Sequence, residues 1–188
     1  MTPAMHRLET TTDNKGRLAA LLVAIFAAAA MRLLPHPPNF SPIAAMALFS
    51  GAQLPRRALA LVAPFAALVL SDIALGGFYA GMNFVYLSFA LTVLIGWGVA
   101  SRKSPLVIGG AAVASSVLFF IVTNFGMWLF SGLYPLTQAG LAACYVAAIP
   151  FFQNTLAGDL LFTAALFGGF ALLERLLPGL RQRQLVAS

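Results

Sequence analysis

The stretch Pro35–Gln53, "PHPPNFSPIAAMALFSGAQ", decides how this chain folds, because it is apolar enough for a membrane but too short to cross one as a helix. Ser41 is a favourable N-cap, and Pro42 stands where the first helical turn tolerates a proline. A helix over the 13 residues from Ser41 to Gln53 covers about 20 Å of a hydrocarbon core about 30 Å thick. The extended "PHPPNF" must complete the crossing, and irregular backbone at that depth survives only when it is buried in protein or lines a cavity. The stretch therefore predicts a short span and a pocket beside it.

The chain as a whole has the composition of a membrane protein. Of its 188 residues, 61% are hydrophobic and 9% are charged, and the mean hydropathy is +0.91. A soluble domain carries about 25% charged residues. Membrane lipid is therefore an expected partner. The net charge of +6 does not indicate a nucleic-acid partner, because the basic residues lie at the ends of apolar runs, as membrane topology requires.

Five other segments reach the length of a helical span, about 20 residues. They are Leu18–Leu34, Arg57–Leu75, Met82–Ala100, Leu106–Phe130 and Phe151–Leu177. With the short span they predict an all-α membrane protein, a bundle of six transmembrane helices. The stretch "TQAGLAACYVAAIP", Thr137–Pro150, precedes the last span. We expect it to form a short helix on the outer surface, which Pro150 separates from that span.

The basic residues predict the orientation of the bundle. Most of them lie in the N-terminal tail, between spans two and three, between spans four and five, and at the C-terminus: Arg7, Lys15, Arg17, Arg56, Arg57, Arg102, Lys103, Arg175, Arg181 and Arg183. The positive-inside rule then places both termini in the cytoplasm. Residues 1–17 and 178–188 become cytoplasmic tails that flank a transmembrane domain of residues 18–177. Only Arg32 and His36, in the first outer connection, depart from this pattern.

Polar side chains within the spans gather in the predicted outer half, except for Gln53. They are Asp72, Asn83, Asn124, Gln153, Asn154 and Asp159. An ionisable group at the centre of a membrane costs at least about 2.5–3.5 kcal/mol and usually has a function. Structural contacts between helices would appear at both depths. The one-sided distribution therefore predicts a cavity that opens to the outer side.

The outer loop "LGGFYAGMNF", Leu75–Phe84, has the composition of a pocket lining, since it carries no charge and three glycines. Glycine lets backbone approach a ligand closely, and aromatic and methionine side chains offer broad contact. Aromatic residues also favour membrane interfaces in general, which is the alternative explanation for part of this pattern. From the outer loops and span ends we predict these ligand-binding residues: Arg32, His36, Asn39, Phe78, Tyr79, Ala80, Met82, Asn83, Tyr86, Asn124 and Tyr134.

The motifs of several enzyme classes are missing. The chain has no GxxxxGK loop for nucleotide phosphates and no HExxH zinc motif. Cys144 is the single cysteine, so neither an intrachain disulfide nor a cysteine-based metal cluster is possible. We therefore expect a binding or transport protein, with no catalytic residues and no resident cofactor. A channel is disfavoured, because the polar groups stop halfway along the spans.

Three stretches resemble a known family: "RLLPHPPNFSPIAAMALFSGA", "LVLSDIALGGFY" and "TNFGMWLFSGLYPLTQAGLAACYVAAIPFFQNTLAGDL". Together, over Arg32–Leu177, they resemble the solitary small transporters of the BtuM type. That family is similar to the six-helix substrate-binding (S) component of energy-coupling-factor vitamin transporters. The resemblance implies uptake of cobalamin or cobinamide across a bacterial inner membrane, through a cavity open to the periplasm. It also implies an energy-coupling membrane subunit and ATPases as partners, unless the protein acts alone.

One position departs from the pattern that the resemblance implies. A BtuM-type protein is expected to carry a cysteine in the loop before span four, as a thiolate ligand for cobalt that helps to remove cyanide. Ala80 stands at the candidate position and cannot donate a lone pair. Either the thiol has been replaced, which we favour, or cobalt is ligated otherwise. His36 and Cys144 are the remaining ligand-capable residues, although a loop hydrogen bond and packing are their more ordinary roles.

Two alternative functions stay open. The same fold can carry another vitamin or small planar metabolite. The chain can also be a proton-coupled secondary carrier that uses Asp72 or Asp159 as the titrating group. We rank this carrier lower, because the sequence shows no inverted repeat of the kind that many carriers have.

Overall fold

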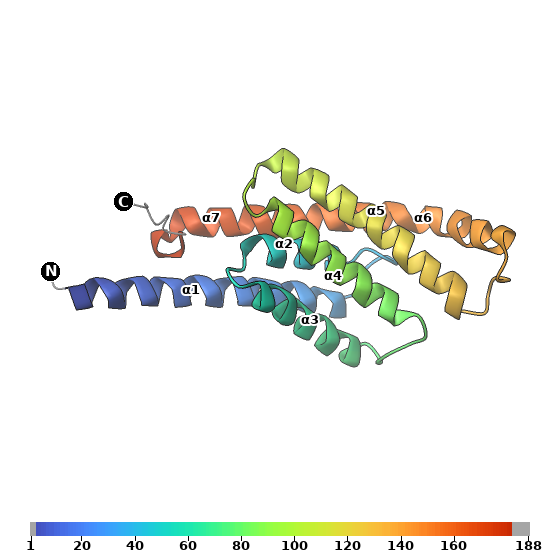
Figure 1. Ribbon diagram of the computed structural model, residues 1–188, viewed down its shortest axis with the longest axis horizontal. Coiled ribbons are helices and arrows are strands. Elements are labelled where there is room, and N and C mark those ends of the chain that lie inside the picture. The colour runs from blue at the N-terminus through green and yellow to red at the C-terminus, as the bar shows by residue number, and fades with distance from the viewer. Residues whose placement is uncertain (1–2, 182–188) are drawn as a thin grey trace.

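The protein is a bundle of helices in the computed structural model, which describes the backbone of residues 3–181 and the side chains of residues 15–181 (Figure 1). The helices are α1 (Pro3–Ala30), α2 (Ile43–Gln53), α3 (Arg57–Ala74), α4 (Met82–Val99), α5 (Pro105–Phe130), α6 (Gln138–Thr163) and α7 (Gly169–Leu176). Three short elements join them: the 3-10 turns η1 (Met31–Leu33) and η3 (Pro178–Leu180) and the π-helical turn η2 (Ala164–Gly168). No strand occurs within residues 3–181. The predicted all-α class is thus confirmed for the described chain.

Five helical segments are long and apolar enough to cross a membrane, as expected for a membrane protein. They are Lys15–Leu33, Arg57–Ala74, Met82–Val99, Pro105–Phe130 and Gln138–Leu176. Large apolar side chains on their outer faces are exposed, for example Val23, Leu70 and Val146. In a soluble protein such faces would be polar, whereas in a bilayer they contact lipid tails.

Helix α1 begins within the segment predicted as a tail, so residues 3–17 continue the first span as one helix. Only Gly16 interrupts a stretch that is otherwise free of helix breakers between residues 4 and 30, and a single helical glycine costs about 1 kcal/mol. The side chain of Arg7, and Arg183 with the rest of residues 182–188, lie outside the described residues.

The short helix α2 is the centre of the bundle. Nine of its 11 residues are buried, and it contacts α1, α3, α4, α5 and α6. It approaches α4 closely where Gly51 faces Gly96. A Cβ on Gly51 would lie 2.3 Å from the Val93 carbonyl oxygen, and one on Gly96 would lie 2.5 Å from that of Leu48. The segment predicted as a short span is thus a buried helix. Its neighbours can surround it because the residues at the closest contacts are small.

The segment between η1 and α2 is irregular, as its sequence predicts. Leu34 is extended, Asn39 has a φ of 63°, and Pro42 forms the N-cap position of α2. The prediction that Ser41 caps this helix is wrong. Its hydroxyl has no hydrogen-bond partner and no side chain caps α2, because the helix starts one residue later than expected.

The predicted break at Pro150 is also wrong, because α6 runs through it without interruption. The segment before the proline packs along α5, where Tyr145 donates to the Ile121 carbonyl at 2.6 Å and its ring lies 5.7 Å from that of Phe120. Pro150 lies on the exposed face of α6, so its ring displaces no packed side chain. After the proline, the Phe152 ring lies 5.1 Å from that of Phe120. The proline removes one backbone hydrogen bond, and the contacts with α5 on both sides of it keep the helix continuous. No separate surface helix precedes the last span.

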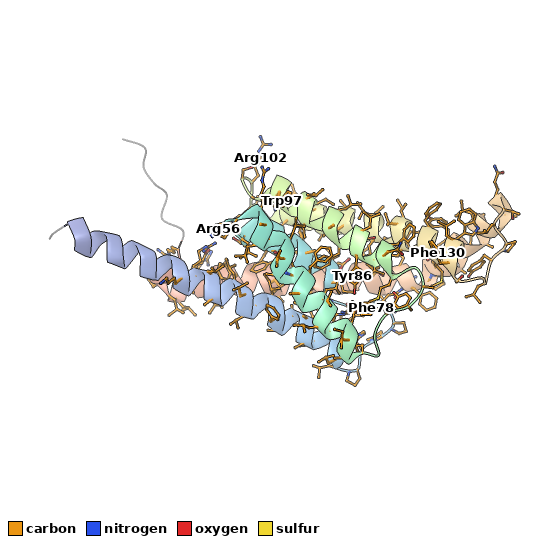
Figure 2. All side chains as sticks on the ribbon, turned by 60° about the horizontal axis from the view of Figure 1, so that its bottom comes forward. Arg56, Phe78, Tyr86, Trp97, Arg102 and Phe130 are labelled. Atoms are coloured by element: carbon orange, nitrogen blue, oxygen red, sulfur yellow. The ribbon has the colours of Figure 1, made fainter. Side chains whose placement is uncertain are left out.

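The two ends of the bundle differ in chemistry. Arg56 and Arg102 lie at one end, and Phe78 and Phe130 lie toward the other (Figure 2). At the basic end, Arg17 forms an ion pair with Glu174 and donates to the Leu180 carbonyl at 2.7 Å and to Gln53 at 3.2 Å. These contacts join α1, α2, α7 and η3 at this end of the bundle. The opposite end contains the cavities described below.

Candidate solute-binding cavities

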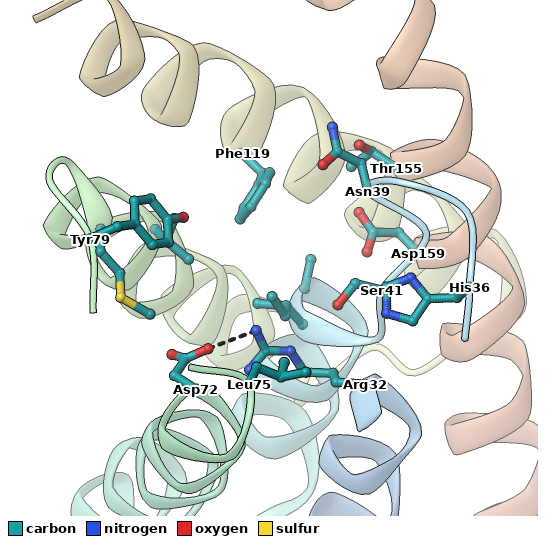
Figure 3. A pocket seen from close by; sticks show the side chains of 14 residues that line it. Arg32, His36, Asn39, Ser41, Asp72, Leu75, Tyr79, Phe119, Thr155 and Asp159 are labelled. Atoms are coloured by element: carbon teal, nitrogen blue, oxygen red, sulfur yellow. Dashed lines mark ion pairs between the residues drawn. The ribbon is translucent and has the colours of Figure 1, made fainter. Parts of the chain in front are cut away.

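A cavity of about 220 Å³, here called the first cavity, lies where the C-terminal ends of α1 and α3 approach the N-terminal ends of α2 and α4 (Figure 3). The segment before α2, the loop between α3 and α4, and helices α2 to α6 each contribute to it. Its lining residues are Arg32, His36, Asn39, Ser41, Ile43, Ala44, Asp72, Leu75, Tyr79, Met82, Val85, Phe119, Thr155 and Asp159. Charged and polar groups thus surround a hollow inside an otherwise apolar bundle.

A buried ion pair forms one wall of the first cavity. Arg32 Nη2 lies 2.7 Å from Asp72 Oδ1, and the Tyr86 hydroxyl donates to Asp72 Oδ2 at 2.9 Å. The Arg32 side chain is 11% exposed and that of Asp72 3%. Arg32 also donates to Ser71 Oγ and, at 3.4 Å, to the Leu68 carbonyl. Both carboxylate oxygens therefore have a donor, which such a buried charge requires.

Asp159 stands on the opposite wall and has different partners. It is 2% exposed, and the Ser116 hydroxyl on α5 lies 2.7 Å from its Oδ2. Figure 3 shows its carboxylate pointing into the cavity from α6, between Thr155 and Ser41. The ion pairs among residues 15–181 do not include it. One wall thus carries a neutralised charge and the other a carboxyl group without a cation.

Tyr79 closes the cavity from the α3–α4 loop. Its partial burial raises the pKa of the phenol above its ordinary value, the Asp72 carboxylate adds to this, and Arg32 opposes it. The hydroxyl is therefore neutral at physiological pH and can donate a hydrogen bond to a bound solute.

The second cavity, of about 350 Å³, lies beside the first between α5 and α6. The two share Asn39, Phe119 and Thr155 as lining residues. The others are mostly apolar: Pro38, Phe120, Thr123, Asn124, Met127, Leu133, Tyr134, Cys144, Ala147, Ala148, Phe151 and Phe152. The Asn124 side-chain amide donates to the Phe120 carbonyl at 2.8 Å. The Cys144 thiol donates to the Asn124 carbonyl at 3.5 Å. The second cavity therefore has a mostly apolar and aromatic lining, whereas the adjacent first cavity has charged side chains.

The structure brings most of the predicted ligand-binding residues to these two cavities. Arg32, His36, Asn39, Tyr79 and Met82 line the first, and Asn39, Asn124 and Tyr134 line the second. Tyr86 lines neither cavity, but its hydroxyl donates a hydrogen bond to Asp72, which lines the first.

Three predicted residues line neither cavity and are exposed: Phe78, Ala80 and Asn83. The two residues considered as cobalt ligands are separated, since His36 lines the first cavity and Cys144 the second. A binding role for each of these residues stays a prediction.

Four lining or supporting residues were not predicted as part of the site: Ser41, Ser116, Phe119 and Thr155. Each is an uncharged hydroxyl or aromatic residue, a type that is also common in ordinary helix packing. The spacing of four between Thr155 and Asp159 is the one signal that could have placed them on one helix face.

These features define a helical membrane protein with a polar hollow at one end. The chain belongs to a family of unknown function, DUF6580, whose model matches residues 12–180. No curated protein and no solved structure matches the chain.

Proposed function

We propose that this protein is a small transporter that takes up cobalamin or cobinamide across a bacterial inner membrane. The observation that carries the proposal is the gathering of the polar groups around neighbouring cavities at one end of the bundle. In this proposal α2 is the sixth span of an S-component type bundle, both termini are cytoplasmic, and the cavities open to the periplasm. An energy-coupling membrane subunit and ATPases are its partners, unless it acts alone.

The two cavities together offer the surfaces that a corrinoid needs. The aromatic side chains of the second cavity suit a large ring with apolar edges, and the first cavity supplies donors for amide oxygens. A corrinoid is larger than either cavity, so binding requires the loops around them to move. Gly76, Gly77, Gly81 and Gly132 have positive φ values in these loops. Such positions suit hinges, since glycine adopts this conformation without strain.

His36 is the cobalt ligand in this proposal, because Ala80 has no donor atom. Its Nδ1 lies 3.0 Å from the Pro37 carbonyl, which only accepts. Nδ1 therefore carries the proton, and Nε2 keeps a lone pair for a metal. The Cys144 thiol is 2% exposed and directed to a carbonyl, so it is the weaker candidate.

A second candidate is the uptake of a smaller vitamin-like solute on the same fold. The volume of the second cavity, about 350 Å³, favours it, because pockets for drug-sized molecules span about 300–1,000 Å³.

The test is binding of cyanocobalamin and dicyanocobinamide to the purified full chain, followed by corrinoid-dependent growth of a strain without its own importer. We expect binding and growth with the wild-type chain and a loss of both with Arg32→Gln. Arg102→Gln, at the other end of the bundle, is the matched control and should retain both. A wild-type chain that binds neither corrinoid contradicts this proposal and leaves the smaller solute.

A further inference from the structure

Asp159 is a buried carboxyl group that forms no ion pair within residues 15–181. Its side chain is 2% exposed, and the ion pairs of the described residues are Arg17–Glu174 and Arg32–Asp72. An ionised carboxylate in such a place is costly unless a cation or several donors accompany it. Asp159 therefore favours its neutral form while the cavity excludes water.

The single hydrogen of the Ser116 hydroxyl can serve either form of Asp159. Ser116 Oγ lies 2.7 Å from Asp159 Oδ2 and 3.1 Å from the Ala112 carbonyl oxygen on its own helix. When Asp159 is protonated, its O–H donates to Ser116 Oγ and the serine donates to Ala112. When Asp159 is ionised, the serine hydroxyl turns and donates to the carboxylate. Neither form requires more than the rotation of one hydroxyl.

The other groups that face the cavity do not remove the need for a proton. Arg32 is engaged by Asp72 on α3, and the phenol of Tyr79 is neutral. His36 lines the cavity from the segment before α2, and the ion pairs of residues 15–181 do not join it to Asp159. From the two helices that flank Asp159 most closely, α2 presents Ala44 and α5 presents Phe119, neither of which is charged. Asp72 differs from Asp159, since Arg32 and Tyr86 satisfy its charge.

We propose that Asp159, with Ser116, is a proton-binding site and that its protonation accompanies solute transport. The proton comes from water in the first cavity, binds to the carboxylate, and returns to water when the carboxyl group ionises again. Its role in transport rests on the proposed transporter function, whereas the protonation site does not. This inference distinguishes Asp159 from Asp72, whose carboxylate oxygens contact Arg32 and Tyr86.

Infrared difference spectroscopy of the purified full chain between high and low pH tests the protonation site. We expect a carboxylic C=O band that appears at low pH in the wild type and in Asp72→Asn, and that is absent in Asp159→Asn. Ser116→Ala should keep the band but shift its frequency, because the O–H of the acid loses its acceptor. Size-exclusion elution and helical circular dichroism confirm that each variant is folded. A band that is absent in the wild type or unchanged in Asp159→Asn overturns the proposal, as does one removed by NaCl at constant pH, which indicates sodium.

Uptake into proteoliposomes tests the coupling. With cyanocobalamin as the probe, we expect an inward proton gradient to increase uptake by the wild type, and Asp159→Asn to bind the probe but to lose the response to the gradient. Wild-type uptake that ignores the gradient overturns the coupling. If cyanocobalamin does not bind at all while the infrared band titrates, the corrinoid proposal fails and the protonation site stands.

Discussion

Gly51 of α2 and Gly96 of α4 face each other so closely that a Cβ on Gly51 would lie 3.0 Å from the Gly96 Cα. Both residues are buried at a crossing where each helix also meets a carbonyl oxygen of the other. The crossing fixes α2 in the centre of the bundle, and α2 in turn carries the irregular segment that lines both cavities. The position of the site therefore depends on the absence of a side chain at both Gly51 and Gly96.

We expect Gly96→Ala to destabilise the protein, because the new methyl group would lie 2.5 Å from the Leu48 carbonyl oxygen and the helices would have to separate. Overpacking of this kind costs about 1–3 kcal/mol. The matched control is Gly98→Ala on the same helix, where a Cβ would meet no atom of another element within 4 Å. This control should be neutral or stabilising by up to about 1 kcal/mol, since alanine is the better helix former. Thermal unfolding in detergent measures both, and equal midpoints would contradict the close crossing.

The hydroxyl of Tyr86 supports the buried ion pair, and its removal should be costly. Tyr86→Phe leaves Asp72 Oδ2 without its donor at 2.9 Å. A hydrogen bond to a charged group contributes about 1.5–3 kcal/mol, so we expect a loss of this order in the free energy of unfolding. Tyr79→Phe is the control, because Tyr79 lines the first cavity beside this ion pair and its side chain is largely exposed. Urea or thermal unfolding of the two variants should separate them, and a loss that is as large in Tyr79→Phe would argue against the assigned bond.

The basic end of the bundle has an excess of positive charge around Gln53. A carboxylate at this position should therefore stabilise the fold, in a way that depends on pH. Arg17 and Lys103 both donate to Gln53 Oε1, at 3.2 and 2.8 Å. Burial and, to a lesser extent, Arg17 lower the pKa of Lys103, while Glu174 acts in the opposite direction. Gln53→Glu would place a carboxylate between these cations, and we expect it to stabilise the fold by about 1 kcal/mol near neutral pH.

The sign of the pH dependence follows from the charge of the new carboxylate. The two cations favour its ionised form in the folded protein. The gain should therefore be complete above the carboxyl pKa of the unfolded chain, about 4.3, and disappear as the pH falls below it. Thermal midpoints of wild type and variant at several pH values measure this. A gain that persists in acid would show that it does not come from charge.

Much of the fold could be predicted from hydropathy, because spans in a membrane must be long, apolar and helical. The short length of the apolar segment that ends at Gln53 also indicated that α2 is too short to cross a membrane as a helix. The errors at Ser41 and Pro150 have one cause. Local signals mark where a helix can start or break, whereas packing decides whether it does, and the contacts of Tyr145 with α5 are not visible in the sequence.

The sequence predicted those site residues whose charge departs from the topology pattern. It did not predict the uncharged residues that resemble ordinary helix residues. Arg32 and His36 stood out against the topology pattern, and both line the first cavity. Asn83 did not reach it because helix phase turns it outward, while Met82 and Val85 face inward on the same helix. Ser116 gave no signal, since one hydroxyl in an apolar helix most often bonds only its own backbone.

The continuity of α6 can be tested at Pro150. In an unbroken helix, Pro150→Ala restores the hydrogen bond from the nitrogen of this residue to the Val146 carbonyl, and it removes the strain of the ring. Alanine is favoured over proline in a helix interior by about 3 kcal/mol, so we expect a higher thermal midpoint with unchanged solute binding. Pro105→Ala is the control, because Pro105 occupies the first turn of α5, where a proline nitrogen has no bond to lose. If α6 were instead two helices that meet at a bend, the helix interior would end at this residue. Pro150→Ala would then raise the midpoint no more than Pro105→Ala does.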